Sequence, residues 1–152
     1  MSNNLHIRYG ELRDVKILSS FGIALAEETE DKTLNPAVLS KGIENHISDR
    51  DKGFYLIAEH GDRIAGSLMI TLEWSDWRNG FFWWIQSVYI LPEFRRKGIF
   101  RDLYEKVKSL AEKQNNVCGL RLYVYKDNEP AMCTYKAMGM QKTDYLLFET
   151  EF

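Results

Sequence analysis

Apolar positions along the chain change their spacing several times, and each spacing predicts one kind of element. Residues Leu5–Tyr9 alternate between polar and apolar side chains, which predicts a short strand. From Leu12 to Ala26 the apolar residues recur at the spacing of one helix face. A second helix is expected to begin at Pro36, because Asn35 suits the cap position and proline suits the first helical turn.

The rest of the chain alternates strands with helices. Strands are expected over Phe54–Glu59, Ile64–Leu72, Phe81–Leu91, Leu120–Tyr125 and Tyr145–Glu149, helices over Gly98–Gln114 and Asn128–Met138, and turns at 60–62 and 74–80. The strand that begins at Phe81 is almost continuously apolar, which is typical of a central strand covered on both faces. This order predicts an α/β protein with one mixed central sheet. The sequence has no repeats or linkers, so one domain is expected over residues 1–152.

Composition narrows the classes of function. The net charge of −2 argues against a general nucleic-acid binder. No stretch approaches the roughly 20 apolar residues of a membrane span, and the first residues lack the basic flank and apolar run of a signal peptide. We therefore expect a cytoplasmic protein with no membrane partner. The two cysteines share no metal-ligand spacing with the histidines, so no metal site is expected.

Residues 88–101 carry the most chemical information, because a buried strand runs there into a basic loop that opens a helix. The first amides of a helix have no internal partner, and the positive end of the helix dipole lies behind them, so they can hold a phosphate group. Gly98 would let a ligand approach the backbone closely. Four cations lie in or beside this turn: Arg95, Arg96, Lys97 and Arg101. Positive charges are unfavourable beside the positive end of the helix dipole. Their presence therefore favours an anion site over an ordinary surface helix with a basic start.

This loop resembles the Arg/Gln-x-x-Gly-x-Gly/Ala signature of the GNAT acetyltransferase superfamily, with Arg95, Gly98 and Phe100 at the signature positions. A later segment resembles the second signature of that family, with an Asn, an Ala, a Tyr and a Gly followed by an apolar residue: Asn128, Ala131, Tyr135, Gly139 and Met140. The resemblance covers nearly the whole chain. It implies the GNAT fold, a mostly antiparallel central sheet with splayed parallel strands and flanking helices. Phe100 departs from the signature, because the family usually has Gly or Ala there.

The resemblance implies acetyl-CoA as the cofactor, bound where a bulge in the long strand makes two parallel strands splay apart. The backbone of Val88, Tyr89 and Ile90 would pair with the pantetheine arm. The pyrophosphate would be held by the amides of Arg96, Lys97, Gly98, Ile99, Phe100 and Arg101. Asn128 would contact the pantetheine side of the cofactor. Its position also suits a helix N-cap, and both roles can hold together.

The resemblance makes Tyr135 the general acid that protonates the departing CoA thiolate. It lies seven residues after Asn128, about two helical turns along the same face. Thiols have a pKa near ~8.5 and tyrosine near ~10, so the proton transfer is feasible at neutral pH. The alternative is a core tyrosine that packs the helix against the sheet. We expect direct attack by a neutral amine, and we assign a packing role to Cys133 because it has no evident histidine partner.

The acceptor and the base are the parts that the residues leave most open. Gln86, the long-strand position that would face the acetyl group, is not a base. Four carboxylates are candidates for the base or for an anionic lip: Glu27, Glu28, Glu30 and Glu73. Trp84 and Trp74 would suit a cationic amine if they line the acceptor site, although core packing explains most aromatic rings in such a stretch.

Three functions remain open at this point. The first is an enzyme that acetylates a primary amine on a small molecule, such as a polyamine, an amino acid or an amino-sugar drug. The second is an enzyme that acts on a protein N-terminus or a lysine. The third is a non-catalytic module that binds or senses acyl-CoA. Tyr135 favours the enzymes, since a pure binder would need no acid there. Dimers are usual in the family, so a homodimer is expected.

Overall fold

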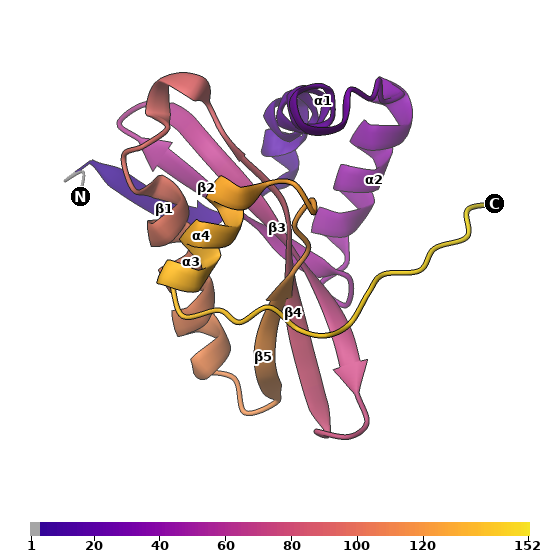
Figure 1. The fold of residues 1–152 in the computed structure, drawn as a ribbon. Helices are drawn as coiled ribbons and strands as arrows, with labels where there is room; N and C mark the ends of the chain where they lie inside the picture. The colour runs from indigo at the N-terminus through magenta and orange to yellow at the C-terminus, as the bar shows by residue number, and fades with distance from the viewer. Residues whose placement is uncertain (1–3) are drawn as a thin grey trace. The chain divides into compact units, whose positions relative to one another are not determined.

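The computed structural model describes residues 4–152, and Figure 1 shows the elements in chain order. The chain divides into two compact units, one ending at Leu122 and the other comprising Tyr123–Phe152. The expectation of one domain over residues 1–152 stays a prediction.

Five strands of the first unit form one sheet. They are β1 Leu5–Tyr9, β2 Gly53–His60, β3 Arg63–Ser75, β4 Gly80–Ile90 and β5 Val117–Leu122, in the order β1-β2-β3-β4-β5. The three pairs among β1, β2, β3 and β4 are antiparallel, whereas β5 is parallel to β4. This confirms the predicted α/β class and a mostly antiparallel sheet that contains a parallel pair of strands.

Helices cover both faces of this sheet. They are α1 Val15–Glu30, α2 Pro36–Ser48 and α3 Ile99–Glu112, with two short 3-10 helices, η1 Leu12–Asp14 and η2 Pro92–Phe94. Helices α1 and α2 lie on one side of the sheet and α3 lies on the other (Figure 1). The start of α2 is as predicted, because Asn35 Oδ1 accepts hydrogen bonds from the amides of Ala37 at 3.0 Å and Val38 at 3.2 Å.

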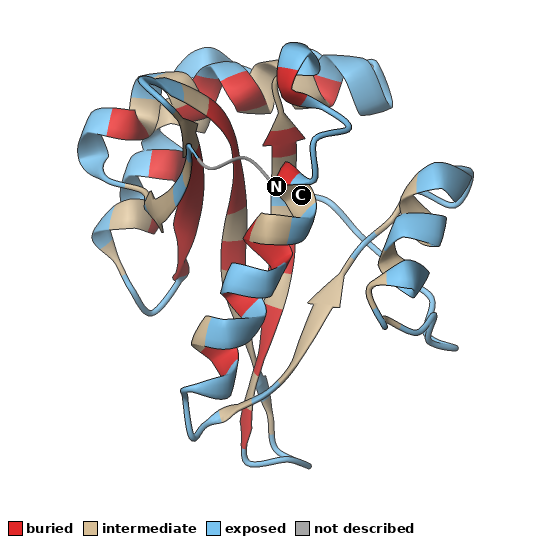
Figure 2. Ribbon diagram, turned by 90° about the vertical axis from the view of Figure 1, so that its left-hand side faces the viewer, coloured by how far each residue is buried: buried red, intermediate tan, exposed pale blue. Residues whose placement is uncertain are grey.

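A hydrophobic core lies on each side of the sheet. Under α1 and α2 the buried cluster consists of Leu18, Ile43, Tyr55 and Ile57. On the opposite side, Leu103 and Val107 of α3 are fully buried. Figure 2 shows the buried positions concentrated along the strands and on one stripe of each covering helix, which is the arrangement that amphipathic helices favour.

Three strand boundaries differ by three residues from the sequence prediction. β3 runs on to Ser75, so part of the expected turn is strand; the Trp74 and Phe81 rings, 5.0 Å apart, pack across this end of the β3–β4 hairpin. β5 begins at Val117 rather than Leu120, because Val117 is the parallel partner of Phe81, and it ends at Leu122 rather than Tyr125, because its pairing with β4 ends at Ile85. At these boundaries pairing with a neighbouring strand decides where the strand begins or ends, and the local sequence pattern carries no information about that pairing.

The second unit consists of one helix and extended chain. Helix α4 spans Glu129–Ala137, and Asn128 caps it by accepting a hydrogen bond from the amide of Ala131 at 3.2 Å. Gly139 follows in the predicted left-handed conformation, with φ 92°. The strand predicted over Tyr145–Glu149 is wrong for this structure, because the segment forms neither helix nor strand and is exposed throughout. A strand requires a neighbour to take its backbone hydrogen bonds.

Candidate active site

The loop between β4 and α3 has the backbone geometry of an anion site. Arg96 and Gly98 both have positive φ, 63° and 79°. Such turns direct successive amides toward a common point, where an anion can bind. A Cβ at Gly98 would meet no atom within 4 Å, so the space beside it is open. The amide of Asp102 donates to the Gly98 carbonyl at 3.0 Å, so the amides before it precede the helical ladder of α3.

Arg95, which was expected to add positive charge to this loop, is turned back toward the sheet and α1. Its Nε donates to the carbonyl of Ile90 at 2.8 Å and its Nη2 to Glu28 Oε2 at 2.9 Å. Its guanidinium also lies 5.4 Å from the ring centre of Tyr89. Arg95 therefore fixes the loop to the end of β4. The remaining predicted cations of the loop are exposed: Arg96, Lys97 and Arg101.

A β-bulge in β4 lies just before the loop. Ser67 of β3 pairs with Tyr89, and Met69 pairs with Gln86. Between these two pairs β4 advances by three residues and β3 by two, so β4 carries one extra residue. The extra residue is at Ser87, which has a φ of 50°. The bulge therefore bends the long strand and increases its twist at this point.

Beyond the bulge, β4 and β5 no longer form a ladder. The parallel pairing runs from Phe81 to Ile85 and ends there, whereas the pairing with β3 continues to Ile90. Along this part of the described chain, β4 thus has a strand partner on its β3 side only. Val88, Tyr89 and Ile90, predicted to pair with a pantetheine arm, lie on this segment. The bulge and the end of the ladder are the geometry that the family resemblance implied.

Most of the predicted acceptor residues of the sheet share the face covered by α1 and α2. Trp74 does not, because it follows Glu73 on β3 and therefore points to the opposite face. Met69 packs against the core cluster under these helices, and Gln86 lies opposite Met69. Side chains directly opposite one another on neighbouring strands share a face, and alternate positions along a strand also share it. Trp84 and Glu73 therefore lie on this face as well. Gln86 is oriented by a hydrogen bond from its Nε2 to Thr71 Oγ1 at 2.6 Å.

Arg121 of β5 joins two of these residues, and sequence reasoning did not identify it. It forms an ion pair with Glu73. Its guanidinium lies 3.5 Å from the ring centre of Phe82 and 6.0 Å from that of Trp84. The only local signal was a cation between two leucines in a predicted strand. The face thus presents aromatic rings together with a carboxylate that is already paired.

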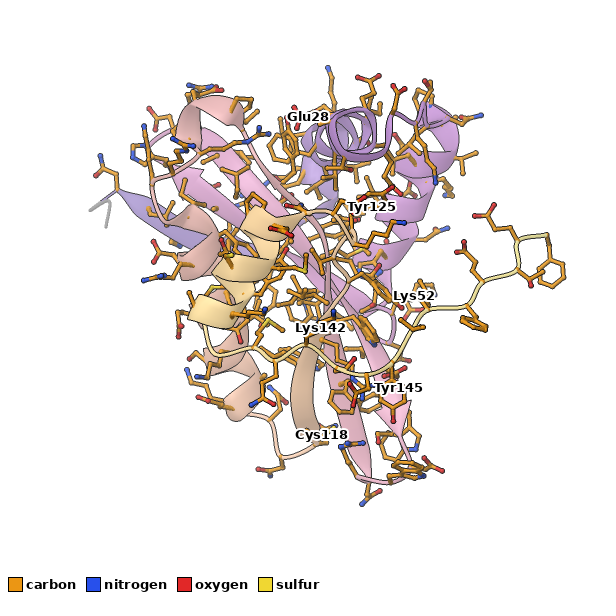
Figure 3. All side chains as sticks on the ribbon, in the orientation of Figure 1. Glu28, Lys52, Cys118, Tyr125, Lys142 and Tyr145 are labelled. Carbon is orange, nitrogen blue, oxygen red and sulfur yellow. The ribbon has the colours of Figure 1, made fainter. Side chains whose placement is uncertain are left out.

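Glu28 lies near the end of α1 (Figure 3) and links this helix to β4 and to the basic loop. The Tyr89 hydroxyl donates to Glu28 Oε1 at 3.1 Å, and the Tyr89 ring packs 5.2 Å from Phe21 of α1. Burial raises the pKa of Tyr89, and the neighbouring Glu28 carboxylate raises it further. The hydroxyl therefore stays protonated at neutral pH and acts as a donor. Glu28 contacts Tyr89 and Arg95, whereas Glu73 pairs with Arg121 of β5, so the two predicted carboxylates belong to separate clusters.

Glu27 and Glu30, the other carboxylates predicted as a base or an anionic lip, are exposed near the end of α1. Tyr135 and Asn128 lie in the second unit. Tyr135 is half-buried on α4, and burial raises its pKa above the ordinary value of 10.0. Its phenol is therefore protonated at neutral pH, which a proton donor requires. Asn128 fulfils the expected capping role.

Two further features of residues 4–152 bear on function. None of their helices combines the length and the apolar character needed to cross a bilayer. These residues also contain no group of three or more histidine, cysteine, aspartate or glutamate side chains that could hold a metal ion.

Comparison with known proteins places this geometry in context. The model of the acetyltransferase (GNAT) family matches residues 21–140. A crystal structure of a possible acetyltransferase from Clostridium difficile 630 is 42% identical, with a TM-score of 0.91 over 99% of both chains. No curated relative matches the chain at a significant level.

More distant structures share the fold. One is a predicted acetyltransferase with acetyl-CoA from Clostridium acetobutylicum, 21% identical, with a TM-score of 0.78 over 96% of each chain. Another is a ribosomal-protein-alanine N-acetyltransferase from Brucella melitensis biovar Abortus 2308, 17% identical, with a TM-score of 0.77 over 97% of this chain and 99% of that one. At these identities the likeness extends to the fold alone.

Proposed function

Because the chain belongs to the GNAT acetyltransferase family, we propose that it transfers the acetyl group of acetyl-CoA to a primary amine on a small molecule. The observation that carries this proposal is the loop between β4 and α3, with its two left-handed residues, directly after a bulged strand that has lost its ladder to β5. An anion site and an unpaired strand segment in succession match a cofactor that has a pyrophosphate joined to an amide-containing arm.

The residues of the first unit fit this cofactor. The amides of residues 96–101 would hold the pyrophosphate, because they precede the helical ladder of α3 and lie at the positive end of its dipole. The open space beside Gly98 would admit the phosphate oxygens. The backbone of Val88 and Ile90 would pair with the pantetheine amides as an added strand does. By the family resemblance, Asn128 would contact the same arm.

The chemistry needs one proton removed and one supplied. Bound acetyl-CoA would bring an activated thioester carbon to the site. The neutral amine attacks that carbon, a C–N bond forms and the C–S bond breaks, so the sulfur leaves as a thiolate. Tyr135 would donate its phenolic proton to this sulfur, which its protonated state permits, and would regain a proton from solvent. The proton lost by the amine passes to solvent or to a carboxylate.

The residues on the proposed acceptor face of the sheet favour a cationic amine as the substrate. Glu73 and Trp84 lie on the sheet face that also carries Gln86, and aromatic rings beside carboxylates attract ammonium groups. Glu73 and Glu28 each accept a hydrogen bond from a guanidinium. Either one must share or release that bond before it can act as the base, so proton removal through water is the simpler route.

Release of free thiol from acetyl-CoA tests the proposal across a panel of small amines and of peptides with free N-termini or lysines. We expect turnover with a small amine and a loss of about 100-fold or more in kcat for Tyr135→Phe, with CoA affinity retained. Tyr125→Phe, a change at an exposed tyrosine of the same unit, is the matched control and should leave kcat unchanged.

Each contrary result points to a different function. Turnover confined to peptides would replace the small-molecule acceptor by a protein substrate. Tight CoA binding without turnover on any amine would indicate the sensing module. Unchanged kcat in Tyr135→Phe would remove that residue from the role of general acid.

A further inference from the structure

Glu28, on α1, contacts two residues of the segment that would bind the cofactor. The Tyr89 hydroxyl donates to its Oε1 at 3.1 Å, and Arg95 donates through Nη2 to its Oε2 at 2.9 Å. Tyr89 lies near the end of β4 and Arg95 follows η2, so one carboxylate joins the strand and the loop to the helix. All three residues lie in the unit ending at Leu122, which is compact by itself.

Arg95 also closes one edge of β4 at the end of the strand. Its Nε donates to the Ile90 carbonyl at 2.8 Å. That carbonyl and the Leu91 amide belong to one trans peptide group and point in opposite directions. The Leu91 amide donates to the Ala65 carbonyl of β3 at 2.8 Å, so the Ile90 carbonyl points away from β3. The Arg95 side chain therefore takes the last carbonyl of β4 on the edge along which the pantetheine arm would lie.

The backbone around Arg95 is held as well. Its amide donates to the Pro92 carbonyl of η2 at 3.2 Å. The next residue, Arg96, has a φ of 63°, a left-handed conformation that costs energy in a residue other than glycine and persists only where the surrounding structure imposes it. The amides that would hold the pyrophosphate begin at Arg96, so their direction depends on how Arg95 is held.

The ion pair between Glu28 and Arg95 adds little to the stability of the fold. The two side chains are 41% and 44% exposed, and ion pairs at this exposure are weak. Its main consequence is for the freedom of the loop. A loop that is already held in its bound conformation loses less conformational entropy when a ligand arrives, so the ligand binds more tightly.

We propose that Glu28 is a positioning residue for the cofactor: it holds Arg95 against the end of β4 and so fixes the pyrophosphate loop relative to the strand that would bind the pantetheine arm. This inference rests on the proposed function, because it takes the loop and the strand to bind coenzyme A. It gives Glu28 no part in proton removal. Both oxygens of the carboxylate already accept hydrogen bonds, and a base would have to give up one of them.

Calorimetric titration with coenzyme A tests this role without an acceptor. We expect Glu28→Ala to bind coenzyme A about fivefold more weakly than the wild type, with an unchanged urea midpoint. Long-range electrostatics alone predicts the opposite sign, because the loss of a carboxylate should strengthen the binding of a polyanion. Glu44→Ala, which removes a glutamate paired with Lys41 on α2, is the matched control and should keep the wild-type affinity.

The contrary results are distinct. Equal or tighter binding by Glu28→Ala would overturn the positioning role and leave the proposed function intact. Weaker binding together with a lower urea midpoint would show a general structural role and would also overturn it. No binding by the wild type would overturn the proposed function itself.

A double-mutant cycle tests whether Glu28 acts through Arg95. Once Arg95→Ala has removed the guanidinium, the carboxylate has no loop side chain left to hold. We therefore expect the double variant, Glu28→Ala with Arg95→Ala, to bind coenzyme A no more weakly than Arg95→Ala alone. Additive losses would show that Glu28 acts on the cofactor by another route and would contradict the proposal.

Glu28→Gln separates positioning from proton removal. A glutamine keeps one oxygen that accepts a hydrogen bond, so it can hold Arg95 or Tyr89 but not both. With an amine that serves as acceptor, we expect the KM for acetyl-CoA to rise about twofold and kcat to stay near the wild-type value. A fall of about 100-fold or more in kcat would assign Glu28 to proton removal and contradict the proposal.

Discussion

In the unit ending at Leu122, apolar side chains are buried on both faces of the sheet, whereas in Tyr123–Phe152 none is buried. The two regions have similar local patterns, since each has a helix with a defined cap and a segment suited to a strand. They differ in whether a neighbouring strand is present. The comparison shows that burial in this protein accompanies strand pairing. The predicted general acid, Tyr135, lies in the region that has no paired strand and less burial.

The largest difference in the free energy of unfolding should appear when a leucine is changed to alanine in each of the two regions. Leu103→Ala removes a fully buried side chain of α3 and should lower the free energy of unfolding by about 3 kcal/mol. Leu146→Ala removes an exposed side chain and should change the free energy of unfolding by less than about 0.5 kcal/mol. Urea titrations compare the two. Equal losses would show that the regions do not differ in burial.

A smaller effect is expected from the polar network that joins β1 to η1. Arg8 binds both oxygens of Asp14, at 2.8 and 2.9 Å, and Asp14 is 3% exposed. Asp14→Asn should cost about 2 kcal/mol, because the guanidinium loses its paired carboxylate while it keeps Glu59. Asp62→Asn in the exposed turn is the control and should be nearly neutral.

The pH dependence of this network has a definite sign. Burial acts to raise the pKa of Asp14, but the hydrogen bonds from Arg8 and from the Glu11 amide outweigh it, so the pKa is lowered. The carboxylate therefore stabilises the folded state above the unfolded pKa of about 4, and this contribution disappears as the pH falls through the folded value. The difference between wild type and Asp14→Asn should shrink in acid. A difference independent of pH would contradict the assignment.

The smallest expected effect comes from His46, a buried residue of α2 that faces β3. Its Nε2–H donates to the Ile70 carbonyl at 2.9 Å, and burial lowers its pKa below 6.5. The unfolded chain thus takes up the proton first, so stability should fall as the pH drops below about 6.5. His46→Gln, which keeps a donor, should flatten that slope between pH 7 and 5, as followed by urea midpoints. An unchanged slope would exclude His46 as its source.

The sequence predicted the parts of the fold that depend on local spacing. The cap at Asn35 and the left-handed Gly139 follow from residue type and position, and both are present. The bulge at Ser87 was implied by the family resemblance, but its position was not, because a serine gives no local signal for a positive φ. The strand expected from Tyr145 has the right composition, but pairing is set by a partner that local sequence does not specify.

In the candidate site, too, the features set by consecutive residues could be predicted, and those set by distant partners could not. The anion loop was predicted because consecutive residues build it. The contacts of Glu28 were not, because Tyr89 and Arg95 lie 61 and 67 positions away in the sequence and meet it only after α1 packs on β4. Arg121 was missed for the same reason, since its partner Glu73 is two strands away in the sheet.

Calorimetric titration of the full chain with coenzyme A tests the central claim, that the loop before α3 binds the cofactor pyrophosphate. Gly98→Ala places a methyl group where the phosphate would lie. Gly61→Ala introduces the same left-handed strain in the β2–β3 turn, where a Cβ also meets nothing within 4 Å. We predict saturable binding by the wild type and by Gly61→Ala, weakened about tenfold or more in Gly98→Ala. No heat with the wild type, or equal affinity in both variants, would contradict the account.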